Sequence, residues 1–336
     1  MLMKVETIQF VDRGKAEFRK TDFNTELAPG EILLKTICTL ISPGTEFACL
    51  NGNTNRGTFS YPATLGYSAV GTVLKCAPDV AGFAVGDRCL CYHSVHRSYQ
   101  KLPASKVVRI DYPELASEEA VFCVVGCMGF QGVRRCRVEL GESVMVMGLG
   151  LLGQFAVQTA ALSGALPVIA LDFNVARRNI ALKRGADAAF SPDMSGLEEE
   201  IKAMTGGGCS SVIEITGNPQ AVVQGLQLTA PGGRISLVGC SRTPTENIDF
   251  YNLVHRPGIT VLGAHNMARP LNDGRPGVWT MRDDMKTLLR FMNAGKVSSR
   301  DLITMKSDPA DAPGIYDRLF NRDPDLLGVV FDWSGY

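Results

Sequence analysis

The segment GLGLLG, which begins at Gly148, has the spacing G-x-G-x-x-G. It follows the apolar run 143–148 and opens a helical pattern over 151–163, so a strand, a tight turn and a helix are expected in succession. Glycines at these places allow the turn, let the backbone approach a pyrophosphate and let the helix pack closely on the strand. Free N–H groups at the helix start attract the phosphates. A glycine-rich turn without a ligand is the alternative. The residues expected to hold a dinucleotide here are Gly148, Gly150, Leu151, Leu152 and Gly153.

Asp172 ends the next apolar run, 167–172, nineteen positions after Gly153. A carboxylate at this place accepts a hydrogen bond from the ribose 2′-hydroxyl of NAD and repels the 2′-phosphate of NADP. Arg177 follows closely and could pair with a phosphate, so NAD is favoured and NADP remains the less favoured alternative. Asp172 could also cap the helix that follows it.

Strand patterns alternate with helical patterns between residues 143 and 264. Strands are expected over 143–148, 167–172, 188–192, 210–216, 234–239 and 258–264, and helices over 151–163, 175–185, 197–208 and 219–233. This alternation is typical of an α/β fold with a parallel sheet. The carboxyl ends of such strands line the ligand crevice. The pairs Thr216–Gly217 and Val238–Gly239 end two strands, so we expect them to flank the ribose and nicotinamide unless they are plain turn residues.

The chain on either side of this block has a different pattern. Short strands are expected over 31–41, 68–77, 86–93 and 106–110, a helix from Ser117, a further helix over 280–295, and strands over 302–305 and 326–333. The sequence therefore predicts an outer, mostly-β domain formed by residues 1–120 and 266–336. A dinucleotide-binding domain of residues 121–265 is inserted into it.

Composition excludes several classes of function. The 336 residues contain 34 Lys and Arg and 34 Asp and Glu, without a basic block, which argues against a nucleic-acid partner. Residues 144–171 carry no charge and are long enough for a membrane helix, but glycines and Pro167 divide them into strand, helix and strand, so no membrane association is expected. No apolar leader segment is found, and the ten cysteines lack the spacing of a disulfide framework. We therefore expect a cytoplasmic protein.

The whole layout resembles the medium-chain dehydrogenase/reductase superfamily. The resemblance rests on four segments: 66–71, GFAVGDR (82–88), GVRRCRVELGESVMVMGLGLLGQ (132–154) and AGKVSSRDLIT (294–304). It implies a GroES-like mostly-β catalytic domain and a Rossmann domain with a doubly wound parallel sheet. It also implies hydride transfer between a nicotinamide cofactor and a small-molecule substrate, and a homodimer.

Members of this superfamily often use a catalytic zinc ion. The resemblance places its three ligand positions at Ser42, at Tyr67 and near Val124, and none of these is a usual zinc ligand. The lobe that carries four cysteines is also missing, because the chain passes directly from Cys91 to Ser98. No zinc is therefore expected. The segments SPGTE, LGYSAVG and GVRRCRVELGE are similar to a zinc-lacking branch that includes bacteriochlorophyllide dehydrogenases and sugar or glycoside 3-dehydrogenases.

Without zinc, hydrogen-bond donors must stabilise the developing alkoxide and a side chain must accept the proton. Tyr67 replaces the zinc-binding histidine and could donate, whereas histidine titrates in the useful pH range. Each candidate has a structural alternative: a core tyrosine, a helix-capping glutamate or a solvated histidine. The candidate catalytic residues are Ser42, Glu46, Tyr67, His93 and His96.

Cys89, Cys91, His93 and His96 also suggest a metal site, but alternate side chains on one strand splay apart and rarely converge on one ion, so no metal ligands are predicted. The favoured function is NAD-dependent oxidation of a secondary alcohol of a sugar, polyol or glycoside, or reduction of the ketone. The alternatives are a zinc-independent enone or quinone reductase and a non-catalytic NAD-binding protein.

Overall fold

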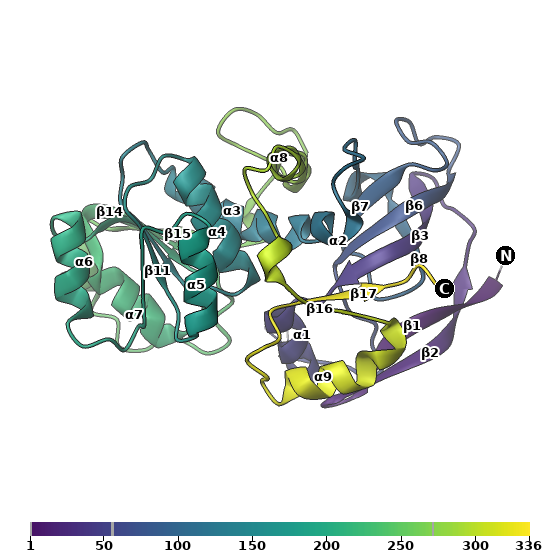
Figure 1. Ribbon diagram of the computed structural model, residues 1–336, viewed down its shortest axis with the longest axis horizontal. Coiled ribbons are helices and arrows are strands. Elements are labelled where there is room, and N and C mark those ends of the chain that lie inside the picture. The colour runs from purple at the N-terminus through teal and green to yellow at the C-terminus, as the bar shows by residue number, and fades with distance from the viewer. Residues whose placement is uncertain (1, 55–56, 271) are drawn as a thin grey trace. The chain divides into compact units, whose positions relative to one another are not determined.

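The computed structural model describes residues 2–54, 57–270 and 272–336 and divides into two compact units (Figure 1). The β unit comprises Met1–Val125 and Met285–Tyr336, and the α/β unit comprises Gly126–Asp284. The sequence-based boundary at residue 266 is therefore wrong, because residues 266–284 belong to the α/β unit. Arg269, within this stretch, donates to the carbonyl of Cys127 and, at 2.6 Å, to Asp284 Oδ2.

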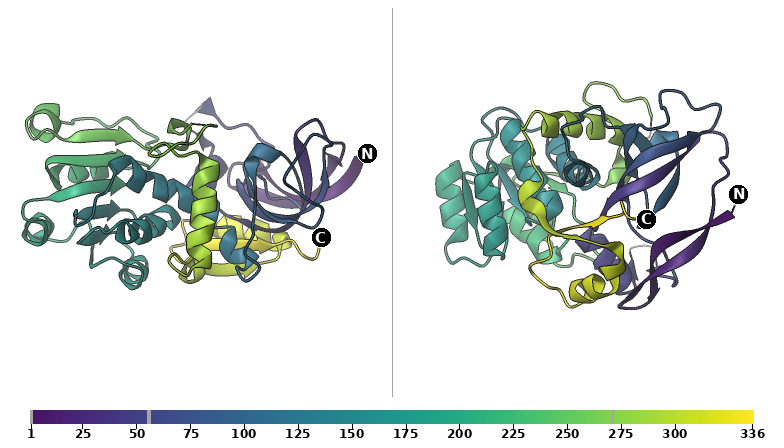
Figure 2. Two further views of the ribbon diagram at one scale, coloured as in Figure 1. Left: turned by 90° about the horizontal axis from the view of Figure 1, so that it is seen from above. Right: turned by 45° about the vertical axis from the view of Figure 1, so that its right-hand side comes forward.

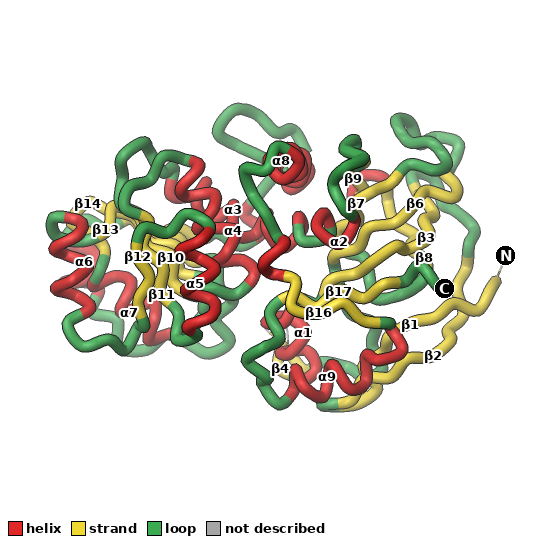
Figure 3. The backbone as a smooth tube through the Cα atoms, in the orientation of Figure 1, coloured by secondary structure: helices red, strands yellow, loops and turns green. Residues whose placement is uncertain are grey.

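The main sheet of the β unit has the strand order β16-β17-β3-β6-β7-β9, with β8 paired to β3 (Figure 3). Its strands are β3 (Glu31–Leu40), β6 (Ser68–Cys76), β7 (Arg88–Tyr92), β8 (Tyr99–Pro103), β9 (Val107–Arg109), β16 (Ile303–Ser307) and β17 (Gly328–Asp332). Most of β3 is buried, which explains its nearly continuous apolar sequence. The C-terminal strand β17 pairs with β3, so both ends of the chain build one sheet.

The described residues of the β unit also form two antiparallel strand pairs and four α-helices, together with the first residues of α3. They are β1 (Leu2–Asp12) with β2 (Lys15–Asn24), β4 (Asn53–Thr54) with β5 (Gly57–Thr58), α1 (Pro43–Leu50), α2 (Ser117–Ala120), α9 (Ala312–Phe320) and most of α8 (Met281–Asn293). Figure 2 shows the purple hairpin of β1 and β2 beside the yellow helix α9, and residues of α9 contact β2. The elements of the β unit that the sequence did not predict are β1, β2, β4, β5, β8, α1 and α9.

The sheet of the α/β unit is parallel, with the order β12-β11-β10-β13-β14-β15. Its strands are β10 (Val144–Met147), β11 (Val168–Leu171), β12 (Ala188–Phe190), β13 (Cys209–Glu214), β14 (Thr229–Leu237) and β15 (Thr260–Gly263). Its helices are α3 (Cys123–Cys136, from residue 126), α4 (Leu151–Leu162), α5 (Val175–Lys183), α6 (Leu197–Thr205) and α7 (Pro219–Gln227). The predicted doubly wound α/β fold is confirmed.

One predicted element of this unit is wrong at its end. The helix expected over 219–233 stops at Gln227, and strand β14 begins at Thr229. The pairing of β13 with β14 shifts register between Cys209 and Ser211, so the turn-forming residues 230–233 are absorbed as an irregularity of the strand.

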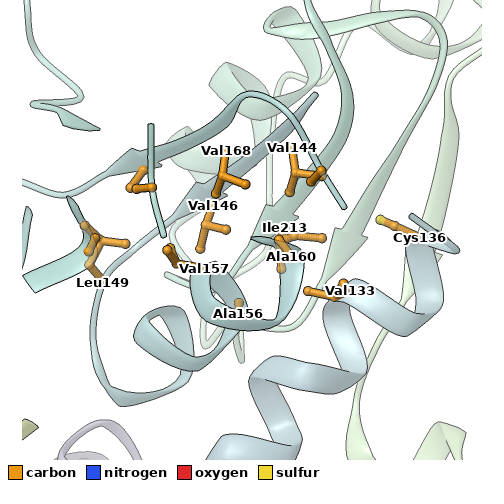
Figure 4. Packing of buried hydrophobic residues seen from close by; sticks show 14 of the residues in the cluster. Val133, Cys136, Val144, Val146, Leu149, Ala156, Val157, Ala160, Val168 and Ile213 are labelled. Carbon is orange, nitrogen blue, oxygen red and sulfur yellow. The ribbon is translucent and has the colours of Figure 1, made fainter. Parts of the chain in front are cut away.

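Helices cover both faces of the parallel sheet. In β10, Val144 and Val146 pack with Val157 of α4 on one face (Figure 4). Met145 and Met147 pack in a separate cluster on the other face, with residues of α6 and α7. Burial on both faces explains the uncharged stretch 144–171, which forms β10, α4 and β11 as predicted. Among the described residues, no helix combines the length and apolarity required to cross a bilayer.

Candidate functional site

The three motif glycines form the turn between β10 and α4, and each meets different surroundings. Gly148 has φ +92°, and a Cβ there would lie 2.8 Å from Thr216 Cγ2. A Cβ on Gly153 would lie 1.8 Å from the carbonyl oxygen of Gly148, so only glycine lets the helix approach the turn. A Cβ on Gly150 would meet nothing within 4 Å. The open space at Gly150 and the uncapped start of α4, with Leu151 and Leu152 as its first residues, fit a bound pyrophosphate.

Asp172 lies directly after β11 and supports the same turn. Its Oδ2 accepts a hydrogen bond from the backbone N–H of Leu149 at 2.7 Å, and its Oδ1 accepts one from Asn174 N–H at 2.8 Å. The N-cap of α5 is Asn174, not Asp172. Each carboxylate oxygen has a second lone-pair direction that remains available to a ribose hydroxyl. Nearby, Arg177 has a buried Nε for which the described residues provide no hydrogen-bond partner.

Glu214 makes hydrogen bonds at the ends of both β13 and β14, and it was not predicted as a site residue from the sequence. Glu214, the last residue of β13, accepts hydrogen bonds from Thr216 N–H at 2.7 Å and from Gly217 N–H at 3.1 Å. Burial raises the pKa of this carboxyl group. An acidic residue inside an apolar strand, followed by Thr-Gly, was the available signal.

Gly239 lies against this loop, because a Cβ there would be 2.2 Å from Gly217 N. The backbone N–H of its neighbour Val238 donates to Glu214 O at 2.8 Å. Thr216, Gly217, Val238 and Gly239 thus meet at the carboxyl edge of the sheet.

In the β unit, Ser42 and Tyr67 form a hydroxyl pair. Ser42 directly precedes α1 and Tyr67 directly precedes β6, and their hydroxyl groups are hydrogen-bonded. The hydroxyl of Thr45, in the first turn of α1, also bonds to Tyr67. Burial and, less strongly, the charge of Glu46 raise the pKa of Tyr67 well above its usual value. Tyr67 is therefore a neutral phenol that can donate a hydrogen bond at physiological pH.

Glu46 and His96 lie behind this pair, and each is only 1% exposed. Glu46 Oε1 accepts from Ser42 N–H at 2.7 Å, which is a capping contact at the start of α1, and Oε2 lies 3.1 Å from His96 Nε2. The hydroxyl of Tyr316, on α9, donates to Glu46 Oε2 at 2.5 Å. This burial favours a positioning role for Glu46 and His96 over contact with a substrate.

The other ring nitrogen of His96 also has a partner. His96 Nδ1 lies 2.7 Å from Thr39 Oγ1, which also accepts a hydrogen bond from the indole N–H of Trp333 at 2.9 Å. If the Thr39 hydroxyl donates a hydrogen bond to Nδ1, then Nε2–H donates to Glu46 and each of these polar atoms has a partner. In this arrangement both ring nitrogens of His96 are occupied by partners inside the β unit.

His93, in contrast, is exposed and follows β7 directly. Its φ is +58°, in the left-handed region that non-glycine residues rarely adopt, and its N–H donates to Tyr67 O at 3.0 Å. Its ring stacks on Tyr92, with 3.9 Å between centroids. Partial burial and the charge of Lys106 lower the pKa of His93 below its usual value, so the ring is neutral at pH 7. His93 and Tyr67 therefore lie side by side at one end of the sheet.

The residues at the three positions where the resemblance implies zinc ligands are not of the usual ligand types. Ser42 and Tyr67 present hydroxyl groups bonded to each other, and Val124 is an aliphatic residue that is 0% exposed. Cys89 and Cys91 are buried in the apolar core of the sheet. Within the described residues, no three His, Cys, Asp or Glu side chains converge as a metal site.

Comparisons with known proteins agree with this architecture. Residues 28–133 match the alcohol dehydrogenase GroES-like domain, and residues 152–293 match the zinc-binding dehydrogenase family. The chain is 28% identical to the D-guloside 3-dehydrogenase of Escherichia coli K12, over 80% of this chain and 77% of that protein. It is 29% identical to the L-threonine 3-dehydrogenase of Pyrococcus furiosus, over 83% and 84%.

The fold is also that of solved dehydrogenases. Galactitol-1-phosphate dehydrogenase from Escherichia coli superposes with a TM-score of 0.85 at 17% identity, covering 97% of this chain and 99% of that one. The two family matches, the glycine-rich turn and the order of the sheets lead to one assignment: the chain belongs to the medium-chain dehydrogenase/reductase superfamily.

Proposed function

We propose that this protein is an NAD-dependent dehydrogenase that oxidises a secondary alcohol of a sugar, polyol or glycoside, or reduces the ketone, without catalytic zinc. Dehydrogenases acting on a CH–OH group are the common feature of its relatives. The observation that carries the proposal is the hydrogen-bonded hydroxyl pair of Ser42 and Tyr67. The family resemblance implies zinc ligands at these two positions.

The cofactor part of the proposal rests on the α/β unit. The open space at Gly150 and the free start of α4 suit a pyrophosphate, and the carboxylate of Asp172 beside the turn favours NAD over NADP. Bound NAD would supply the acceptor for the substrate hydride. A protein of similar fold, a putative zinc-binding dehydrogenase from Sinorhizobium meliloti, was solved with bound NADP. NADP is therefore the alternative cofactor, and it should be tested together with NAD.

The β unit supplies the proton chemistry in this proposal. Tyr67 remains protonated and donates a hydrogen bond to the substrate oxygen, where negative charge develops during oxidation. His93 is neutral at pH 7 and exposed, so it accepts the proton of the substrate hydroxyl. Ser42 and Thr45 hold the phenol in place through hydrogen bonds.

The test is NADH absorbance with purified, chelator-treated protein, NAD or NADP, and a panel of sugars, polyols and glycosides. We expect NADH formation, and we expect Tyr67→Phe to lower kcat by about 100-fold, as removal of one oxyanion donor does. Tyr61→Phe is the matched control, because Tyr61 donates to Cys49 O and Leu50 O at the other end of α1. Activity that returns only with added zinc would contradict the proposal. If no NADH or NADPH forms either without or with added zinc, an enone or quinone reductase or a non-catalytic role would be favoured.

We also propose that the protein is a homodimer, as the resemblance implies. Strand β15 (Thr260–Gly263) ends the strand order of the α/β sheet, and Val261 on it is 42% exposed. An open sheet edge with an apolar side chain can pair with a second copy. Light scattering of the purified protein would measure the mass, and a monomer at micromolar concentration would contradict this part.

A further inference from the structure

The buried carboxylate of Glu46 is the centre of a network that the proposed reaction does not use directly. Three donors converge on it from three parts of the β unit: the Ser42 N–H before α1, His96 after β7, and Tyr316 on α9. Glu46 and His96 are 1% exposed and Tyr316 is 0% exposed. A buried charge with this many hydrogen bonds holds a defined geometry, because each lost partner leaves an unsatisfied group.

The network reaches the hydroxyl pair through the main chain. Glu46 Oε1 holds the N–H of Ser42, and the side chain of the same residue bonds to the Tyr67 hydroxyl. A change in the position of Glu46 therefore moves the backbone at Ser42 and with it the partner of the phenol. The carboxylate also acts on Tyr67 electrostatically, since its negative charge opposes ionisation of the phenol.

Tyr316 is the member of the network that connects it to the C-terminal part of the chain. Its hydroxyl donates a hydrogen bond to Glu46 Oε2 at 2.5 Å. Burial and, less strongly, the nearby carboxylate raise the pKa of Tyr316, so the hydroxyl remains a donor. Its ring packs edge-on to Phe10, with 4.8 Å between centroids. Loss of the Tyr316 hydroxyl would leave this packing intact and remove one of the three donors to the carboxylate.

We propose that Tyr316 is a positioning residue for the reaction: through the Glu46 carboxylate it fixes Ser42 and thereby the hydroxyl group of Tyr67. This inference rests on the proposed function for its effect on turnover, but its structural step can be measured without a substrate. Helix α9 has, on this inference, a second task besides packing on the hairpin of β1 and β2.

The first experiment uses ¹⁹F NMR of the full-length protein with its tyrosines replaced by 3-fluorotyrosine. The Tyr67 resonance is assigned by its loss in Tyr67→Phe. We expect it to shift in Tyr316→Phe and in Glu46→Gln, which keeps the shape of the side chain but removes its charge. Tyr251→Phe is the matched control, because Tyr251 lies in the α/β unit and is 62% exposed. An unchanged Tyr67 resonance in folded Tyr316→Phe and Glu46→Gln would overturn the proposal.

The second experiment measures turnover with the panel substrate that gives the highest rate. A positioning role predicts that Tyr316→Phe lowers kcat about tenfold while KM and the NADH dissociation constant change less than about twofold. A general loss of folded protein would lower the melting temperature and every activity together, and the proposal would then be wrong. A shifted Tyr67 resonance without turnover of any panel member would support the positioning step and contradict the proposed function instead.

Discussion

At the scale of single residues, His93 combines an exposed ring with a backbone conformation that costs energy. As the proposed base it must be neutral, so the kcat/KM of alcohol oxidation should fall as the pH drops through the pKa of His93, which partial burial and the charge of Lys106 lower from its usual value. We expect His93→Asn to lower kcat/KM by about 100-fold or more and to abolish this acid limb. Asparagine tolerates the left-handed region, so the loop should keep its path. The measurement is the pH profile of both proteins.

His255→Asn is the control for this prediction. His255 contacts the ring of Tyr251 in the α/β unit, and it has no part in the proposed proton chemistry. Its replacement should leave the acid limb in place. If the acid limb persisted unchanged in His93→Asn, another group and not His93 would accept the proton of the substrate hydroxyl.

The residues of the site were predictable from the sequence only where their signal is local. The glycine-rich turn and Asp172 stand in a short motif that the sequence shows directly, and Ser42 and Tyr67 were identified through the family resemblance. The partners that fix them cannot be read this way, because Tyr316 and Glu46 are 270 positions apart and Trp333 and Thr39 are 294 apart. Contacts of this kind arise only when β17 pairs with β3 and α9 packs on the hairpin.

At the scale of elements, two glycines of the turn between β10 and α4 have different roles: Gly153 is needed for stability, and Gly150 for the proposed cofactor binding. Gly153→Ala places a methyl group 1.8 Å from Gly148 O, which the backbone must relieve, so we expect a loss of about 3 kcal/mol in the free energy of unfolding. Gly150→Ala meets open space at an ordinary φ of −66°, so stability should change by less than about 0.5 kcal/mol.

The same two variants test the dinucleotide site. The methyl group of Gly150→Ala would occupy the space proposed for the pyrophosphate, so we expect the NADH dissociation constant to rise at least about tenfold, near 1.4 kcal/mol. Denaturant unfolding and NADH fluorescence titration measure both quantities. If Gly150→Ala bound NADH with unaltered affinity, the proposal that the pyrophosphate binds at this turn would be wrong.

Elements with strong patterns were predicted correctly, and those with mixed patterns were not. Strands β10, β11 and β13 are buried on both faces and have apolar sequences without ambiguity. Strand β2, KAEFRKTDFN, is largely polar because much of it is exposed, and α9 begins with Ala-Pro-Gly, which suggests a turn. The local sequence of these two segments favours no single secondary structure. Their structure is determined by the packing between β2 and α9.

At the scale of the whole molecule, the chain passes from one unit to the other at residues 125–126 and 284–285. Asp284, at the second passage, is 0% exposed and lies 2.6 Å from Arg269 and 2.8 Å from Arg134 Nε. Arg134 is itself stacked between the rings of Phe130 and Trp279. These ion pairs attach residues 266–284 to α3, which is why the boundary expected at residue 266 is wrong.

Asp284→Asn tests how strongly this attachment stabilises the molecule. The substitution leaves the guanidinium groups of Arg269 and Arg134 without their carboxylate, and Arg269 has a side chain that is only 2% exposed. Breaking a buried ion pair from one side costs about 3–5 kcal/mol, because the remaining charge is neither paired nor solvated. We therefore expect a loss of this size in the free energy of unfolding, together with faster amide hydrogen exchange in residues 266–284.

The control is Glu198→Gln, which removes an exposed ion pair with Lys202 on α6. This variant should lower the free energy of unfolding by less than about 0.5 kcal/mol. Equal stability of the two variants would mean that apolar packing, and not the Asp284 carboxylate, holds this segment to the α/β unit.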